Sequence, residues 1–367
     1  MKDVWLFACI EKNIGDDLFV YTISKRYPDI QFTITSDADY GSLSELKNLV
    51  FSDDLKRWIW ASSIGENSIA KRMVGYVLQK VFEFKIKKKD IAVYIVGNAF
   101  KNLNYVGKFQ TRWIKERLKL ADEFYLLSTN FGPFNDNRWV LDCSGVFSEM
   151  ADVCFRDKDS FAYFKNIKCV RYAPDAVFCL GKKKNKAKKM LLISVIDFSF
   201  DIRGDELRKK TMLYEEKMVD IANGYISDGY EVIFLNSNKN QDQIASERII
   251  QKIMIKKNIR VINYDGDLTV VFDLYKNAGS IIATRLHTIV LAFLYGIPVI
   301  PIEYDIKVTN LLKMCRFKGC SISLDDLEIL NYDFVKRVLL EYTFVLSDEI
   351  IEKANEQFEC LDKKLKI

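Results

Sequence analysis

A chain of 367 residues is longer than one ordinary domain, and because about half of its residues are apolar it can bury two sizeable cores. The charged content of 29% fits a soluble surface rather than a disordered or fibrous chain, and the modest net charge of +5 slightly favours small anionic ligands or an anionic lipid surface and indicates little about nucleic acid. No stretch approaches the roughly 18 apolar residues of a membrane span. The apolar start Val4–Ile10 lacks the pattern of a cleaved signal, so we expect a cytoplasmic protein.

The first half alternates short apolar runs with amphipathic stretches, which is the pattern of βαβ units around a mostly parallel sheet. The expected strands are Val4–Ile10, Ile30–Thr35, Ile91–Val96, Glu123–Ser128, Val153–Phe155 and Lys168–Arg171. The expected helices are Asp16–Arg26, Ile69–Phe84, Phe109–Leu120 and Lys158–Lys165. Residues 1–181 are therefore predicted to form a Rossmann-like domain.

A run of lysines follows this half. Gly181–Lys189 holds six lysines in nine residues, and we interpret residues 182–189 as a solvated linker between domains. Contact of these lysines with anionic lipid, at the inner face of a membrane, is the alternative.

The rhythm of strands and helices then starts again. The expected strands are Met190–Val195, Glu231–Leu235, Arg260–Asn263 and Ser280–Ala283, and the expected helices are Tyr214–Ser227, Gln243–Lys256 and one from Leu268. Residues 190–345 are predicted to form a second Rossmann-like domain. Residues 346–367 are predicted to add a helix that packs back on the first domain. The predicted class is α/β, with two Rossmann-like domains facing a central cleft, a GT-B-like architecture.

Cysteine and histidine usage bounds the metal chemistry. Eight cysteines are scattered without a C-x-x-C pair, and the chain has one histidine, His287. We expect reduced thiols in the core and no zinc or other soft-metal site.

The most informative segment runs from residue 283 to residue 307. A buried strand ends at Thr284, a helix runs to Gly296, and an apolar strand follows from Pro298 to Ile302. Arg285 and His287 then lie in the first turn of a helix that starts where a strand ends. Backbone N–H groups and the helix dipole favour an anion there, and a guanidinium adds a fork for phosphate or carboxylate. Alternatively, Arg285 pairs with a neighbouring carboxylate and His287 is a hydrogen-bonded structural residue.

Several patterns, in order along the chain, resemble those of the polysaccharide pyruvyl transferase family. They are Asn13-Ile14-Gly15-Asp16, Gly132-Pro133, Arg156-Asp157…Ser160, Ala173-Pro174-Asp175…Phe178, and the R-L-H-T…Y-G-I-P-V-I…Y-D-I-K run from Arg285 to Lys307. Two positions depart from the family: the turn Val96–Phe100 keeps only one glycine, and Lys12 stands where a glycine is common. The resemblance implies that residues 1–181 form the acceptor side of the site and residues 190–345 the donor side, so both departures concern loops of the acceptor side.

The resemblance implies transfer of the enolpyruvyl unit of phosphoenolpyruvate to two hydroxyls of one sugar, in surface or capsular polysaccharide biosynthesis. The products are a cyclic pyruvate ketal and phosphate. The implied catalytic residues are His287 as proton donor, Arg285, and Asp16 as acceptor-side base. Donor binding is expected at Arg285, Lys307, Arg156 and Thr288, and acceptor binding at Asn13, Gly15, Asp16 and Asn98. No cofactor is expected, because phosphoenolpyruvate is itself activated. The expected partners are this donor and a sugar acceptor, with a lipid-linked oligosaccharide as one form, and no nucleic acid.

Simpler interpretations stand beside these roles. Asp16 can be a carboxylate that stabilises a helix start, and Arg156 can form an ion pair with Asp157. Asp265-Gly266-Asp267 resembles a metal-binding pair, but we favour a turn in which Asp267 caps the following helix.

Two other functions fit the same architecture. A glycosyltransferase would release a nucleoside diphosphate from a nucleotide sugar instead of phosphate from phosphoenolpyruvate. A non-catalytic glycan-binding protein would bind saccharide without releasing phosphate.

Overall fold

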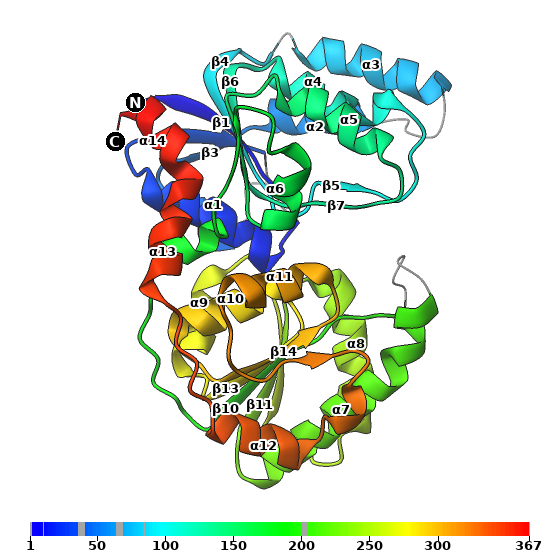
Figure 1. The fold of residues 1–367 in the computed structure, drawn as a ribbon, viewed down its shortest axis with the longest axis vertical. Helices are drawn as coiled ribbons and strands as arrows, with labels where there is room; N and C mark the ends of the chain where they lie inside the picture. Colours follow the sequence, from blue (N-terminus) through cyan, green and yellow to red (C-terminus); the bar gives the residue numbers. More distant parts are fainter. Residues whose placement is uncertain are drawn as a thin grey trace. The chain divides into compact units, whose positions relative to one another are not determined.

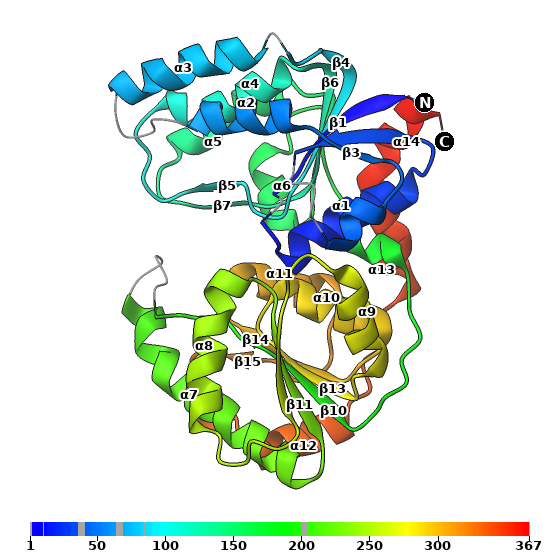
Figure 2. The same cartoon turned by 180° about the vertical axis from the view of Figure 1, so that it is seen from behind.

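Two parallel β-sheets organise the chain in the computed structural model, which describes residues 2–9, 11–35, 41–63, 69–83, 85–199 and 205–366 (Figure 1, Figure 2). The first compact unit comprises Met1–Glu11, Asp16–Cys179 and Ile351–Ile367. The second comprises Lys12–Gly15 and Leu180–Ile350. The α/β class with two Rossmann-like domains, expected from the sequence, is confirmed.

The first unit is built on a parallel sheet with the strand order β3-β2-β1-β4-β6-β8-β9, beside a two-stranded sheet of β5 and β7. Its strands are β1 (Asp3–Phe7), β2 (Gln31–Ile34), β3 (Leu49–Phe51), β4 (Lys89–Ile95), β5 (Phe100–Asn102), β6 (Ala121–Thr129), β7 (Phe131–Phe134), β8 (Asp152–Phe155) and β9 (Val170–Tyr172). Its helices are α1 (Ile14–Arg26), α2 (Asp53–Ser63), α3 (Ile69–Glu83), α4 (Arg112–Leu118), α5 (Arg138–Phe147) and α6 (Lys158–Phe164), with short 3₁₀ turns η1 (Gly41–Glu45), η2 (Lys108–Thr111) and η3 (Ala176–Leu180).

The second unit has a parallel sheet with the strand order β12-β11-β10-β13-β14-β15. Its strands are β10 (Met190–Ser194), β11 (Glu231–Asn236), β12 (Ile259–Asn263), β13 (Ser280–Ala283), β14 (Val299–Glu303) and β15 (Ile322–Ser323). Its helices are α7 (Asp205–Ser227), α8 (Lys239–Lys252), α9 (Leu268–Asn277), α10 (Leu286–Tyr295), α11 (Ile306–Met314) and α12 (Tyr332–Leu340), with η4 (Leu327–Ile329).

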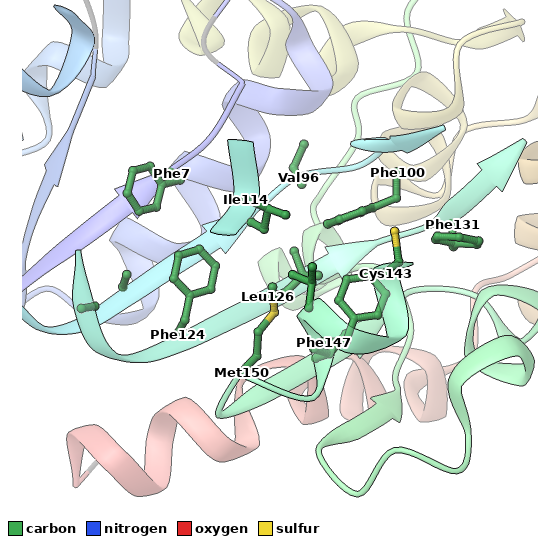
Figure 3. Close-up of a cluster of buried hydrophobic side chains, with 14 of the residues drawn as sticks. Phe7, Val96, Phe100, Ile114, Phe124, Leu126, Phe131, Cys143, Phe147 and Met150 are labelled. Atoms are coloured by element: carbon green, nitrogen blue, oxygen red, sulfur yellow. The ribbon is translucent and has the colours of Figure 1, made fainter. Parts of the chain in front are cut away.

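A cluster of aromatic side chains fills the core of the first unit (Figure 3). Phe7 of β1 stacks on Phe124 of β6 at a centroid distance of 5.9 Å. Phe147 of α5 meets Phe100 edge-on at 5.0 Å and Phe155 of β8 at 5.7 Å. The strands β1 and β8 are buried over nearly their whole length, as in a parallel sheet that is covered on both faces.

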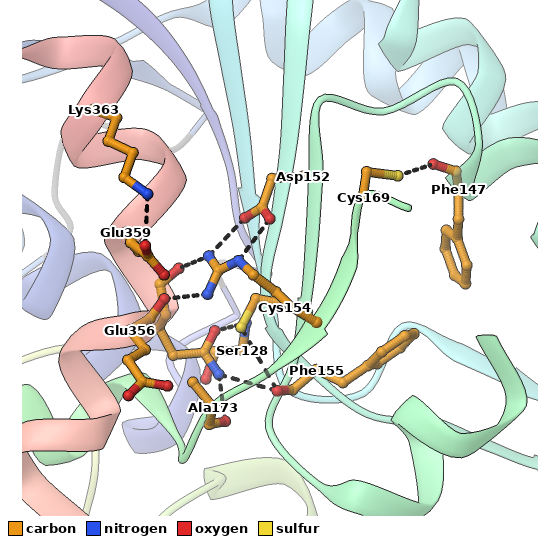
Figure 4. Close-up of polar contacts among 12 residues, drawn as sticks. Ser128, Phe147, Asp152, Cys154, Phe155, Cys169, Ala173, Glu356, Glu359 and Lys363 are labelled. Atoms are coloured by element: carbon orange, nitrogen blue, oxygen red, sulfur yellow. Dashed lines mark hydrogen bonds and ion pairs between the residues drawn. The ribbon is translucent and has the colours of Figure 1, made fainter. Parts of the chain in front are cut away.

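The C-terminal segment consists of α13 (Asp348–Ala354), η5 (Asn355–Phe358) and α14 (Glu359–Leu365), so the single helix expected over residues 347–366 is interrupted. It is tied to the first unit by buried Gln357, whose Oε1 accepts from Ser128 N at 2.9 Å and whose Nε2 donates to Ala173 O at 2.8 Å (Figure 4). Arg171 donates to Asp152 and to the backbone of residues 356 and 357. The chain end therefore completes the first unit across β6, β8 and β9.

The lysine run is anchored on the second unit rather than free. Its lysine side chains are exposed, but Asn185 donates to the carbonyl oxygens of Tyr275 at 2.7 Å and Ala278 at 2.9 Å, capping the end of α9. The backbone N–H groups of Lys186 and Lys188 donate to the last residues of the same helix.

Other local differences have simple causes. The helix expected over Phe109–Leu120 begins as the 3₁₀ turn η2 and is α-helical only from Arg112. Asp267 caps α9, as expected, by accepting from Thr269 N at 2.8 Å. The expected ends Ile10 and Phe84 lie outside the described residues.

Candidate functional site

The second unit has its topological switch point between β10 and β13, which are adjacent in the sheet but whose following strands lie on opposite sides. Because all the strands run parallel, their carboxyl ends meet at one edge, where open α/β sheets bind ligands. Ser194 ends β10, and Thr284 follows β13 with its N–H donating to Ser194 O at 3.0 Å. The edge beside this pair is the candidate site.

Helix α10 starts at this edge. Arg285 holds the N-cap position with an extended backbone, and Gly296 ends the helix at φ 61°, a left-handed conformation that glycine adopts without strain. A guanidinium only donates hydrogen bonds, so this N-cap residue cannot accept from the first turn as serine or aspartate would. Thr288 is buried in that turn and lies 3.1 Å from Ser194 through their hydroxyls. His287 lies between Arg285 and Thr288 and is partly exposed.

Arg285 pairs with Asp242 of α8, which is the alternative that its sequence position left open. Its Nε donates to Asp242 Oδ1 at 3.1 Å, and its Nη2 donates to the same carboxylate and to Gln241 Oε1 at 2.9 Å. Burial is the largest influence on the pKa of Arg285 and lowers it, but the charge and hydrogen bonds of Asp242, with smaller contributions from Tyr304 and Tyr214, together raise the pKa above its usual value, so the guanidinium stays protonated. Among the described residues, none accepts a hydrogen bond from Nη1, which leaves one edge of the fork for a ligand.

The segment Lys12–Gly15 contacts the same edge. Asn13 forms an antiparallel bridge with Asn238, and Ile14 N donates to Ser237 O at 3.1 Å. Asn13 also caps α1, because its Oδ1 accepts from Gly15 N at 2.9 Å. Gly15 lies against His287 so closely that a Cβ on it would fall 2.1 Å from Nδ1 of the imidazole. The N-x-G-D loop therefore positions the only histidine of the chain.

Lys307 follows the neighbouring strand β14, in the first turn of α11. Asp305 caps α11 by accepting from Lys307 N at 3.1 Å, and the Lys307 ammonium lies 3.9 Å from the same carboxylate. The ammonium also lies 5.2 Å from the centroid of the Tyr304 ring. β13 and β14 are adjacent, so the structure brings Arg285, His287 and Lys307 to one sheet edge.

Arg156 lies in the first unit, inside a buried network. Its Nη1 donates to Asp175 at 2.8 Å, and its Nη2 donates to Asn130 at 2.8 Å. It packs against Gly97, where a Cβ would lie 3.2 Å from both terminal nitrogens. Asp157 instead caps α6 by accepting from Ser160 N at 2.8 Å. The local pair of Arg156 with Asp157 is therefore wrong, because the capping geometry turns the carboxylate toward its own helix.

The remaining expected acceptor residues also lie in the first unit. Asp16 is in the first turn of α1, where a carboxylate stabilises the helix dipole, and Asn98 is exposed after β4. Burial, followed by the Asp16 charge, raises the pKa of the Cys9 thiol to about 12, so Cys9 is not a nucleophile at neutral pH.

Sequence reasoning missed two charged residues near these edges. No sequence pattern distinguishes Asp242, because it is one of several polar residues at the start of α8. Arg117 of α4 lies over the rings of Phe7 and Trp113, at 5.7 and 5.1 Å, and donates to Trp113 O at 2.7 Å. Burial lowers its pKa, and no carboxylate of a described residue pairs with it.

In the described ranges, no three His, Cys, Asp or Glu side chains lie close enough together to hold a metal ion. All eight cysteines are free thiols. None of the helices in the described part of the chain combines the length and hydropathy that a membrane crossing requires.

Solved structures with this arrangement define the class. A UDP-GlcNAc 2-epimerase from Methanocaldococcus jannaschii, solved with UDP-GlcNAc and UDP, is 13% identical with a TM-score of 0.54, covering 99% of this chain and 100% of its own. A candidate UDP-N-acetylglucosamine 2-epimerase from Listeria monocytogenes is 9% identical with a TM-score of 0.55, covering 100% and 96%. At these identities the likeness concerns the fold alone, a GT-B-like arrangement of two Rossmann-like domains.

Within this class, the model of the polysaccharide pyruvyl transferase family matches residues 13–306, and the chain belongs to that family. The amylovoran biosynthesis protein AmsJ of Erwinia amylovora is 22% identical over 257 residues, which cover 63% of this chain. The match spans 61% of the length of AmsJ.

Proposed function

We propose that the chain uses phosphoenolpyruvate to place a cyclic pyruvate ketal on a sugar. The observation that carries the proposal is that Arg285 and His287 at the start of α10, and Lys307 at the start of α11, follow the carboxyl ends of the adjacent strands β13 and β14. Two cations and a helix N-terminus suit a ligand that bears both a phosphate and a carboxylate. Membership of the polysaccharide pyruvyl transferase family supports the same donor.

The reaction balances without an external oxidant or reductant. A proton adds to the methylene carbon of the donor, and one sugar hydroxyl adds to the adjacent cationic carbon and loses its proton. Phosphate then leaves with the electron pair of its C–O bond, and the second hydroxyl adds to the same carbon. One hydroxyl proton balances the proton taken up by the new methyl group, and the other balances the proton on the released hydrogen phosphate.

His287 is proposed as the donor of the proton to carbon, because it lies in the first turn of α10, directly after Arg285 and Leu286, and its ring is packed against Gly15. Arg285 is proposed to hold the donor through the edge of its guanidinium that faces away from Asp242. Lys307 neutralises the second anionic group. Asp16 is proposed as the base for the sugar hydroxyl, with Asn13, Gly15 and Asn98 as acceptor contacts. Arg156 and Thr288 both make buried hydrogen bonds, to Asp175 and Ser194. Their roles in donor binding stay predictions.

The test is phosphate release from phosphoenolpyruvate against a panel of synthetic glycosides and lipid-linked oligosaccharides. We expect release that depends on one acceptor class and falls about 10²–10⁴-fold in His287→Gln, the usual range for loss of a general acid. Nucleotide sugars, run in parallel, should give no nucleoside diphosphate. Turnover of a nucleotide sugar, or a His287→Gln variant with normal turnover, would contradict the proposal.

A further inference from the structure

The outward face of α3 in the first unit is unusually apolar. Met73, Val74, Val77 and Val81 are 67%, 54%, 59% and 54% exposed, and they lie at the three- and four-residue spacing that puts side chains on one side of a helix. Single exposed aliphatic residues are common on protein surfaces, but a continuous row on one helix is not.

The inward face of α3 shows that this row does not result from an ordinary amphipathic helix. Gly75 and Gln79 are buried on that side, and α3 packs there against α2. On the same inward side, Phe82 is half-buried against the core of the unit, so apolar side chains lie on both sides of α3 and the packing of this helix does not account for the exposed row. Figure 1 and Figure 2 show α3 lying along the outside of the unit.

Basic residues surround this row. Lys80 lies on α3 and pairs with Glu83 at 2.5 Å, and Lys85 and Lys88, which follow the helix, pair with Asp54 at 3.9 Å and Asp122 at 2.5 Å. These are surface ion pairs, which bind weakly and leave the lysines able to exchange partners. Lys87 and Arg57 are exposed. In sequence, residues 53–88 hold eight Lys or Arg and four Asp or Glu, so most of the net charge of +5 falls in about a tenth of the chain. Trp60, 56% exposed on α2, adds a ring suited to the boundary between headgroups and acyl chains.

We propose that this face, the α3 surface of Met73, Val74, Val77, Val81 and their basic neighbours, docks on an anionic lipid bilayer. A helix that lies in the interface places its apolar side chains at the acyl boundary while lysines reach the anionic headgroups. The charge of the surrounding residues matches a lipid surface better than a second protein, because each lysine adds attraction to a uniformly negative plane. That this brings the site to a lipid-linked acceptor rests on the proposed function; the docking itself does not.

The test is co-sedimentation of the full chain with vesicles of phosphatidylcholine alone or with about 30 mol% phosphatidylglycerol. We expect binding only to the anionic vesicles, weakened by salt. Val77→Ser with Val81→Ser should lower the partition coefficient at least tenfold. The matched control is Leu340→Ser with Val345→Ser, which removes two residues of the second unit that are 77% and 74% exposed and should leave binding unchanged.

Three outcomes would overturn the docking proposal. The unchanged chain could stay in the supernatant with anionic vesicles, the Val77/Val81 variant could bind as well as the unchanged chain, or the control could weaken binding equally. A dimer in sedimentation velocity that the Val77/Val81 variant dissociates would show that a second copy covers the face instead. Phosphate release on a soluble acceptor, measured on the same variant, separates this inference from the proposed function, since it should not change.

Discussion

Gly15→Ala tests how the N-x-G-D loop acts on the site. The added Cβ would lie 2.1 Å from Nδ1 and 2.8 Å from Cε1 of His287, against an ordinary contact of about 3.5–4 Å. The loop and the ring must therefore separate by more than about 1 Å. Overpacking of this size costs about 1–3 kcal/mol of stability, whereas a 1 Å misplacement of a catalytic group costs about 10²-fold in rate. We expect a folded protein whose turnover falls about 10²-fold.

The assay is phosphate release under saturating donor, with thermal unfolding to confirm that the variant folds. Gly145→Ala is the matched control, because Gly145 lies in α5 with nothing within 4 Å of its added Cβ. This control should keep its turnover and gain a few tenths of a kcal/mol, as alanine is the better helix former. Normal turnover in Gly15→Ala would refute the close positioning of His287 by the loop.

Four further variants probe other contacts. Arg285→Lys keeps the charge but loses the fork, so the KM for phosphoenolpyruvate should rise about tenfold or more in steady-state kinetics; an unchanged KM would remove Arg285 from donor binding. Changing four lysines of residues 182–189 to serine should leave turnover within about threefold. Asn185→Ala loses two hydrogen bonds to the end of α9, so it should lower the free energy of unfolding, measured with denaturant, by about 1–2 kcal/mol. A larger loss of stability from the lysine changes than from Asn185→Ala would contradict the anchoring. Burial raises the pKa of Asp197, but hydrogen bonds, chiefly from Arg248, hold it below its usual value. Its stabilisation is therefore present above about pH 3.9 and lost as the pH falls through the folded pKa, so Asp197→Asn should lower the unfolding free energy by about 1–3 kcal/mol at pH 7, and less near pH 3. A difference independent of pH would contradict the ion pair.

Local signals made the site edge predictable. An apolar strand, an arginine at its end and a glycine past the next helix fix the start and end of α10, because each depends on neighbours in sequence. The cap at Asp267 was predictable for the same reason. The family resemblance, and not periodicity, singled out Asn13–Asp16 and His287, and no feature of the sequence predicted that Gly15 packs against the imidazole.

Long-range partners were not predictable. Asp242 lies 43 residues from Arg285, and Gln357 lies 229 residues from Ser128, so no local pattern links either pair. The strands β5 and β7 were missed because three or four residues carry too little alternation to detect. The lysine run is anchored through one residue, Asn185. The composition of the run, with six lysines, indicates only a linker.

The most direct test of the proposed ketal transfer is to run the reaction of phosphoenolpyruvate with a sugar acceptor in D₂O. The proposed scheme takes the new methyl hydrogen from an exchangeable group, so the product should be a sugar ketal whose methyl group carries one deuterium, formed with one phosphate per ketal. NMR of the product distinguishes this methyl from an unlabelled one. A ketal with no deuterium in its methyl group, or no ketal with any acceptor while phosphate is released, would contradict the proposed chemistry.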